Sequence, residues 1–370
     1  MELRKMLTGV GTALAFSWGA GPVAQADVYT MSNEVAGNQV IAFDILKSGS
    51  LVEIGRFDTG GTGTGAVLGN QGALATDASD RWLFVVNPGD GTLTSFRLQA
   101  AGLEFVSIVP SGGFRPISVT VFGALVYVVN EGDPNDPVNN PDNISGFRFG
   151  PSGVLEPIPN STRPLSAHIT APAQIGFNKS GTVLLITEKA TNTLTTYVMQ
   201  PDDTPAATPF TRNSAVPTPF GFEFGDRDYV FITEANNGGT GVVAVYRVAR
   251  DTGEVSNLVD LLELGGAACW TVLSNDQTIG YVTNTASGTV SIYRINFDGT
   301  LEPFLSNAPN RQIPTGAGPR DAILTQNNEF FYTLNPPARE IRAFRVNRNG
   351  NIFRRGTVAI PPSASGLMAR

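Results

Sequence analysis

The chain of 370 residues contains one cysteine, one histidine and few charged side chains. Cys269 has no partner for an intramolecular disulfide, and His168 alone cannot form a multi-histidine metal site. Charged residues make up 15% of the chain, the net charge is −7 and Lys and Arg do not cluster. Nucleic acids and other anionic polymers are therefore poor partners. Beyond the N-terminal segment, no apolar run approaches the roughly twenty residues of a membrane-spanning helix.

The N-terminus has the pattern of a signal peptide. Arg4 and Lys5 precede an apolar run from Met6 to about Ala20, and small residues follow in Ala24-Gln25-Ala26. We expect cleavage after Ala26, which makes residues 1–26 a signal peptide and leaves a secreted or periplasmic protein.

The chain is rich in glycine and proline, although it has few charged residues. The chain has 41 Gly and 25 Pro, and hydrophobic residues make up 41% of it. This composition is typical of an all-β domain with many turns. A closed ring of repeats can hold this length as one domain, because each repeat packs only on its neighbours. We therefore expect one domain over residues 27–370.

One sequence pattern recurs roughly every 50 residues, which is the length of a four-stranded propeller blade. It consists of a hydrophobic strand that ends in Asn or Glu, a polar turn and a second strand. The seven ends are Asn33, Asn87, Asn130, Glu188, Glu234, Asn284 and Asn335. The repeat predicts a seven-bladed β-propeller.

The inner strands predict how the ring closes. Six segments, most of them led by Pro, precede the second strands of blades two to seven, whereas the chain from Val28 starts directly on a second strand. The C-terminal segment Pro361–Met368 has the missing pattern. We therefore expect the C-terminal strand to pair with the first blade, which leaves no open sheet edge there.

With second strands such as Tyr281–Asn284, which reads YVTN, and inner strands that begin with Pro, the chain resembles the seven-bladed lactonase family. This family includes bacterial 6-phosphogluconolactonases, fungal carboxy-cis,cis-muconate cyclases and many YVTN-repeat proteins. The resemblance covers essentially the whole mature chain and implies the propeller fold. Two family features differ: Pro172–Ile175 stands where relatives carry a Pro-His-x-His motif, and Pro219–Phe220 places no cation beside Glu234.

Unusual polar residues gather on one predicted face of the ring, where inner strands start and second strands end. Such convergent polar groups are the default hypothesis for a site. The face is expected to carry Arg115, Gln174, Arg320 and Asp321 at inner-strand starts, Glu131, Glu188, Lys189 and Glu234 at second-strand ends, and Arg163 and His168 on a connection.

Glu188 and Glu234 stand where five blades have Asn. A carboxylate can move a proton during lactone ring opening or closure, while a cation such as Arg320 or Lys189 stabilises the oxyanion. The alternative is that each Glu accepts hydrogen bonds in its turn or pairs with Lys189. His168 is a third candidate for the general base. The alternative is that it is a surface-loop residue with no functional role. Arg115, Arg163, Gln174 and Asp321 complete the candidate substrate contacts.

The longest insertion, residues 130–143, mixes Asp and Asn with three prolines. Its oxygen donors are compatible with Ca²⁺, but it lacks the spacing of an EF-hand and its prolines suit a rigid lid. We expect no cofactor, with calcium as a minor alternative.

Two functions fit the sequence. The first is an exported lactone hydrolase or cycloisomerase that acts on a small anionic substrate in the central pocket. The second is a non-catalytic propeller that binds a protein, sugar or envelope partner through the same face. A ring with covered edges has no need to associate, so a monomer is expected.

Overall fold

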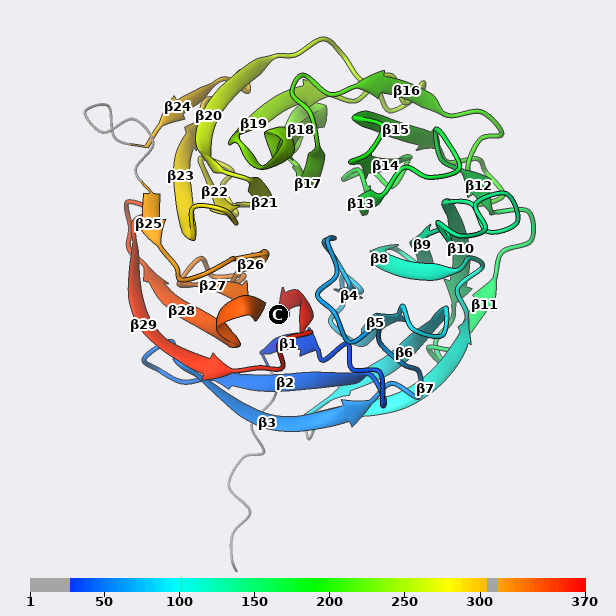
Figure 1. Ribbon diagram of the computed structural model, residues 1–370, viewed down its shortest axis with the longest axis horizontal. Helices are drawn as coiled ribbons and strands as arrows, with labels where there is room; N and C mark the ends of the chain where they lie inside the picture. Colours follow the sequence, from blue (N-terminus) through cyan, green and yellow to red (C-terminus); the bar gives the residue numbers. More distant parts are fainter. Residues whose placement is uncertain (1–26, 101, 305–311) are drawn as a thin grey trace, which may run out of the picture.

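Seven antiparallel sheets stand in a ring around a central axis in the computed structural model (Figure 1). It describes residues 27–100, 102–304 and 312–370. The seven-bladed all-β propeller predicted from the repeat is confirmed. The expected signal peptide and its cleavage site lie outside the described residues. None of the helices in the described part is long and apolar enough to cross a membrane.

The first three blades read from the axis outward as follows. Blade one is β30 (Ser365–Ala369), β1 (Val28–Met31), β2 (Gln39–Ile45) and β3 (Leu51–Asp58); blade two is β4 (Leu74–Thr76), β5 (Trp82–Asn87), β6 (Thr92–Gln99) and β7 (Gly102–Pro110); blade three is β8 (Arg115–Phe122), β9 (Leu125–Glu131), β10 (Asn143–Phe149) and the short β11 (Leu155–Pro157) and β12 (Arg163–Pro164).

The other four blades repeat this order. Blade four is β13 (Pro172–Phe177), β14 (Val183–Glu188), β15 (Thr193–Val198) and β16 (Phe210–Asn213); blade five is β17 (Pro219–Phe224), β18 (Tyr229–Glu234), β19 (Thr240–Arg247) and β20 (Asp260–Gly266); blade six is β21 (Ala268–Leu273), β22 (Ile279–Asn284), β23 (Thr289–Ile295), β24 (Leu301–Pro303) and β25 (Gln312–Pro314); blade seven is β26 (Asp321–Leu324), β27 (Phe330–Asn335), β28 (Glu340–Val346) and β29 (Ile352–Ala359). Three single-turn 3-10 helices, η1 (Asp226–Asp228), η2 (Asn236–Gly238) and η3 (Pro336–Ala338), lie in turns.

The second strands are buried along most or all of their length. All six residues of β5, β14 and β27 are buried, whereas most residues of the outer strands β3 and β29 are not. A strand covered on both faces by neighbouring sheets reads as a continuous hydrophobic run rather than an alternating one. The aromatic residues near the ends of the third strands, such as Phe43, Tyr197 and Tyr293, complete the packing between blades.

The ring closes through both ends of the chain. Strand β30 pairs antiparallel with β1, with Val28 opposite Ala369 and Met31 opposite Ser365. Ser363 Oγ also donates to the carbonyl oxygen of Ser32 at 2.7 Å. The predicted C-terminal inner strand of the first blade is therefore confirmed, and Figure 1 shows the C-terminus beside β1.

Candidate functional site

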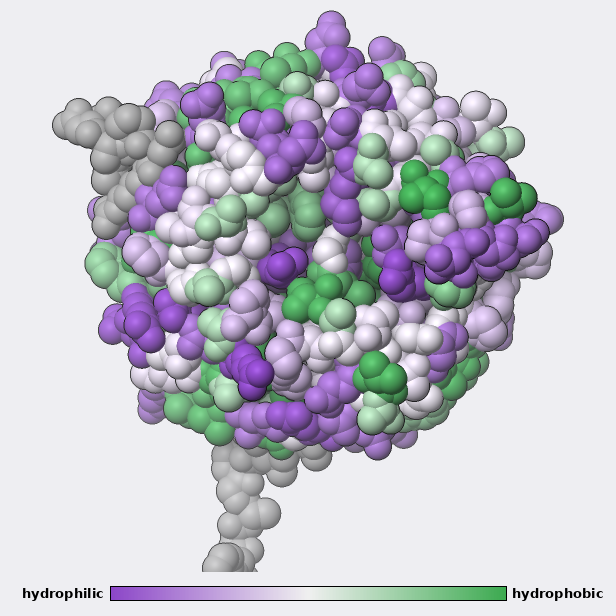
Figure 2. Space-filling model, in the orientation of Figure 1, coloured by the Kyte–Doolittle hydropathy of each residue, from purple (hydrophilic) through white to green (hydrophobic). Residues whose placement is uncertain are grey.

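The face formed by inner-strand starts and second-strand ends is hollowed near the axis of the ring, where hydrophilic and hydrophobic residues meet (Figure 2). A β-bulge lies near this end in blades one, three, four, five and six, between the first and second strands. Bulges re-aim side chains and are frequent beside functional sites. The side chains at this end of the inner strands thus form the candidate site.

Lys189 follows β14 and reaches toward the axis. Its Nζ donates to the carbonyl oxygens of Gly69 and Pro172, the second at 3.0 Å, and lies 5.1 Å from the centre of the Phe220 ring. Burial lowers the pKa of Lys189 to about 8, although the negative charge of Glu131 acts in the opposite direction. Lys189 is thus a cation near the ring centre that can lose its proton at mildly basic pH.

Two arginines bring further positive charge to this region. Arg115 forms an ion pair with Glu131 at 2.9 Å, and the charges of both residues act on Lys189. Arg320 begins blade seven, and its charge and that of Lys189 both act on the buried thiol of Cys269. The Nε atoms of Arg115 and Arg320 are buried and have no hydrogen-bond partner among the described residues. The structure therefore brings Arg115 within electrostatic reach of Lys189, and brings Lys189 and Arg320 within electrostatic reach of the same thiol.

The connection into β4 crosses the ring axis, as Figure 1 shows. We call residues 68–71 the central segment. Gln71 is fully buried; its N–H donates to the carbonyl oxygen of Ala173 at 2.9 Å, and its Nε2 donates to that of Arg320 at 2.5 Å. The central segment therefore joins blades four and seven across the middle of the candidate site.

Two neighbours of Gln71 extend this bridge. The N–H of Leu68 donates to Ser365 Oγ of β30 at 3.2 Å, and Asn70 Nδ2 donates to the carbonyl oxygen of Ile117 in β8. Together with Lys189, these contacts fasten the segment to blades one, three, four and seven.

Glu188, at the end of β14, forms a hydrogen-bonded joint between blade four and the connection that leads into it from blade three. The fully buried carboxylate accepts hydrogen bonds from the N–H and hydroxyl of Ser166, from Thr191 Oγ1 at 2.9 Å and from Thr195 Oγ1 at 2.6 Å. Asn284 forms the same joint in blade six, where its Oδ1 accepts from the Gly265 N–H at 3.2 Å and its Nδ2 donates to Ser291 Oγ at 2.9 Å. A hydroxyl rotates to serve either partner, so the two residue types are interchangeable in this role.

Glu234 makes the corresponding joint in blade five. It is fully buried and accepts from the N–H groups of Ala215 and Val216, at 3.3 and 2.5 Å, and from Tyr246 Oη at 2.7 Å. Burial raises the pKa of Glu234 to about 7. These local partners favour the turn-acceptor interpretation for both glutamates, and their role in proton transfer stays a prediction.

Gln174 and Asp321 lie on inner strands but are engaged with the scaffold. The side chain of Gln174 bonds both the N–H and the carbonyl oxygen of Phe222, at 2.7 and 3.1 Å, and so links β13 to β17. Asp321 Oδ1 accepts from the N–H of Ala322 at 2.8 Å, while Oδ2 is buried without a partner among the described residues. Burial holds the pKa of Asp321 well above its ordinary value.

Arg163 and His168 lie away from the axis. Arg163 is on the outer strand β12, where it donates to the carbonyl oxygens of Ala206 and Pro205 at 2.9 and 2.6 Å. His168 is exposed, and its carbonyl oxygen accepts from the N–H of Asp142. The geometry does not bring either residue together with Lys189.

The insertion after β9 is held by its own side chains. Asp133 Oδ1 accepts from the Asn135 N–H at 2.9 Å, and Asp136 accepts from Asn139 Nδ2 at the same distance. Asp142 is buried and accepts from the N–H groups of Gly132 and Thr170. Within the described ranges no group of three or more His, Cys, Asp and Glu side chains could hold a metal ion.

Glu223, which sequence reasoning missed, lies farther along the inner strand β17. Its carboxylate accepts from the Leu273 N–H at 2.7 Å, and burial raises its pKa to about 7. A charged residue between Phe222 and Phe224 in an otherwise apolar inner strand was the available signal, because alternate inner-strand positions face the axis.

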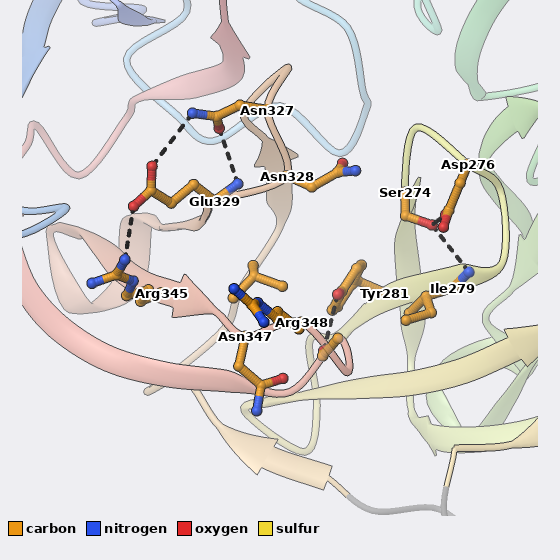
Figure 3. Close-up of a pocket in the computed structure, with 12 residues that line it drawn as sticks. Ser274, Asp276, Ile279, Tyr281, Asn327, Asn328, Glu329, Arg345, Asn347 and Arg348 are labelled. Atoms are coloured by element: carbon orange, nitrogen blue, oxygen red, sulfur yellow. Dashed lines mark hydrogen bonds and ion pairs between the residues drawn. The ribbon is translucent and has the colours of Figure 1, made fainter.

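A pocket of about 410 Å³ lies between blades six and seven on the opposite face (Figure 3). Its polar groups are mostly paired with one another: Glu329 with Arg345 at 3.0 Å, and Asp276 Oδ1 with Ser274 Oγ at 2.6 Å. The turns of three hairpins, β21–β22, β26–β27 and β28–β29, form most of this lining. We place the candidate site at the ring axis instead, because buried polar atoms without partners occur there.

Comparison with known proteins supports the architecture. No protein-family model matches the chain, and no curated protein sequence matches it significantly. Among solved structures, the periplasmic gluconolactonase of Pseudomonas aeruginosa is similar with a TM-score of 0.72 and 17% identity, over 92% of this chain and 98% of that one. A candidate 6-phosphogluconolactonase of Bacteroides fragilis is similar with a TM-score of 0.70 and 16% identity, over 94% and 99%.

The same fold also occurs in a structure of a different kind. Hydrazine synthase of Kuenenia stuttgartiensis is similar with a TM-score of 0.60 and 13% identity, over 90% of this chain and 99% of that one. The likeness therefore shows the propeller fold alone, and activity must be argued from the site.

Proposed function

We propose that the chain is an exported, lactonase-like propeller that binds a small carboxylated substrate at the ring axis and opens or closes its lactone ring. The observation that carries this proposal is the positive charge at the ring axis: Arg115 acts on Lys189, and Lys189 and Arg320 both act on the Cys269 thiol. An arginine guanidinium suits a carboxylate, and a partly desolvated ammonium suits a carbonyl oxygen that gains negative charge. The solved lactonase structures of the same fold agree with this class of substrate.

In ring opening, a water molecule attacks the lactone carbonyl carbon, and the ring oxygen leaves with a proton. The Lys189 ammonium stabilises the oxyanion, and Arg115 or Arg320 holds the substrate carboxylate. Glu131 is the carboxylate whose charge acts on Lys189 most strongly, and it is partly exposed. In this scheme it takes the water proton and passes it to the departing ring oxygen. Ring closure follows the same steps in reverse.

The experiment is a panel of hydroxy-acid lactones, with ring opening followed by proton release. Lys189→Met should lower kcat/KM at least a hundredfold, as loss of one oxyanion donor does in other hydrolases. Lys179→Met is the matched control, because Lys179 forms an exposed ion pair with Asp226 at 2.8 Å on the opposite face. An absence of turnover across the panel, or equal turnover by wild type and Lys189→Met, would remove this function.

The second candidate is a non-catalytic propeller that binds its partner through the same face. The central segment favours it, because this segment covers Lys189 and crosses the place where a substrate would enter. Calorimetric binding of a sugar acid such as D-gluconate, weakened by Lys189→Met and accompanied by no turnover of any lactone, would support this candidate over the first.

A further inference from the structure

The central segment occupies the place of a ligand. The carbonyl oxygen of Gly69 accepts from Lys189 Nζ, as a substrate carbonyl or carboxylate oxygen would. Gly69 is exposed, whereas Asn70 and Gln71 beneath it are buried. While the Gly69 carbonyl holds that position, it takes up a donor of the Lys189 ammonium that a ligand oxygen would use.

In this position the central segment leaves two of its hydrogen-bond acceptors without partners. Asn70 Oδ1 and Gln71 Oε1 are buried and have no hydrogen-bond partner in the described part of the chain. Unpartnered buried oxygens lower the stability of the arrangement that buries them. Both atoms belong to the segment itself, so moving it outward would return them to water.

The chain on either side allows such a movement. Gly65 and Gly72 flank the segment with φ angles of +73° and +69°, a region that favours glycine. Gly65 is exposed, and beyond it the connection contains Gly60, Gly61 and Gly63. The segment therefore lies between two points at which the backbone can change direction at low cost.

We propose that residues 68–71 form a gate: they close the central site in this structure, and a small organic anion binds Lys189 only after they move out on Gly65 and Gly72. The gate rests on the proposed site but not on its catalysis. The ligand's oxygen replaces the carbonyl oxygen of Gly69, and the fold of the seven blades does not change.

The single cysteine offers a direct test. Cys269 is buried, and the charges of Lys189 and Arg320, which the central segment contacts, act on its thiol; we therefore expect a thiol reagent to reach it when the gate opens. N-ethylmaleimide labelling, followed by mass spectrometry at constant pH, should be slow in wild type. It should be about tenfold faster in Gln71→Ala, which loses the bond to the Arg320 carbonyl oxygen.

Two controls separate gate opening from unfolding. Gln39→Ala removes an exposed glutamine that donates to Asp58 at 2.6 Å on the rim, and it should label like wild type. Urea well below the unfolding transition should hardly change the labelling rate, because a local opening exposes little surface. If Gln71→Ala does not fold, Asn70→Ala, which loses the bond to Ile117, takes its place.

Equal labelling of wild type and the gate variant would overturn the proposal, as would rates that rise with urea at the slope of global unfolding. Calorimetry with D-gluconate distinguishes the gate from the function. Tighter binding by Gln71→Ala is expected, because the open fraction sets the apparent affinity. Binding of equal strength would contradict the gate. Gate opening seen by labelling, together with failure of every lactone to turn over, would sink the catalytic function and leave the gate in place.

Discussion

Thr30 and Gly366 are separated by 336 positions in the sequence, yet Thr30 Oγ1 donates a 2.6 Å hydrogen bond to the carbonyl oxygen of Gly366. This bond lies at the seam where β1 and β30 pair. The seam joins strands from opposite ends of the chain, so the first blade exists only when both ends are present. Its closure also brings Ser365 to the central segment, whose Leu68 N–H bonds Ser365 Oγ.

Deletion of residues 363–370 should destabilise the whole ring. It removes β30 and the buried side chains of Leu367 and Met368, each worth about 1.5–3 kcal/mol of burial. The free energy of unfolding of an ordinary domain is only about 5–15 kcal/mol, so this loss is a large share of it. The melting temperature should therefore fall by roughly 10 °C or more. Removal of Arg370 alone, which leaves Ser365–Leu367 in place, is the control. A truncated protein that melts with wild type would show that the seam is dispensable.

Glu188 allows the two interpretations of the glutamates to be separated. Glu188→Ala should cost about 1–3 kcal/mol, chiefly because the Thr195 hydroxyl is a buried donor that would be left unpaired. Glu188→Asn should restore much of that stability, because Asn284 makes the same joint in blade six. Urea unfolding measures the first effect.

The same pair of variants reports on catalysis. If Glu188 is structural, Glu188→Asn should turn over lactones at the wild-type rate. A stable Glu188→Asn protein with at least a hundredfold loss of kcat would instead establish Glu188 as a proton-transfer group.

Local patterns made the blades predictable from the sequence, whereas contacts across the ring were not. Each second strand is a continuous apolar run with an Asn or Glu at its end, and counting these runs against the inner strands was enough to place β30. Gln71 and Arg320 are 249 positions apart and meet only because the ring closes. No local pattern in a glycine-rich connection indicates that meeting.

The candidate site was predictable in part for the same reason. Strand ends placed Arg115, Lys189 and Arg320 on one face of the ring, because their positions follow from the blade register. The direction of a side chain does not follow from register alone. Glu188 and Glu234 occupy the predicted strand ends, yet both turn into the joints that asparagine forms elsewhere in the ring.

Glu234 should make the protein less stable as the pH rises from about 4.5 to 7. Burial raises its pKa from 4.5 to about 7, so the folded protein holds this proton more tightly than the unfolded chain does. The stability that the bound proton provides is present below pH 4.5 and is lost through this window, roughly 3 kcal/mol in total. Glu223 acts in the same direction.

Urea unfolding between pH 5 and 7.5 tests this linkage. Glu234→Gln cannot ionise, so its stability should fall less steeply with pH than that of wild type. Glu302→Gln, on the exposed edge strand β24, is the control and should keep the wild-type slope. Parallel curves for wild type and Glu234→Gln would mean that Glu234 is ionised throughout, as its three hydrogen-bond donors would favour.

Lys189 should give lactone turnover a pH dependence with a definite sign. In the proposed scheme its ammonium stabilises the oxyanion, and its pKa is about 8. The value of kcat/KM, corrected for spontaneous hydrolysis, should therefore decline as the pH rises through about 8. Lys189→Arg keeps its charge, so its residual activity should not decline in this range, whereas Lys179→Met should retain the wild-type profile. A wild-type rate that increases through pH 8 would show that the neutral amine removes the proton from water, which would exchange the roles of Lys189 and Glu131.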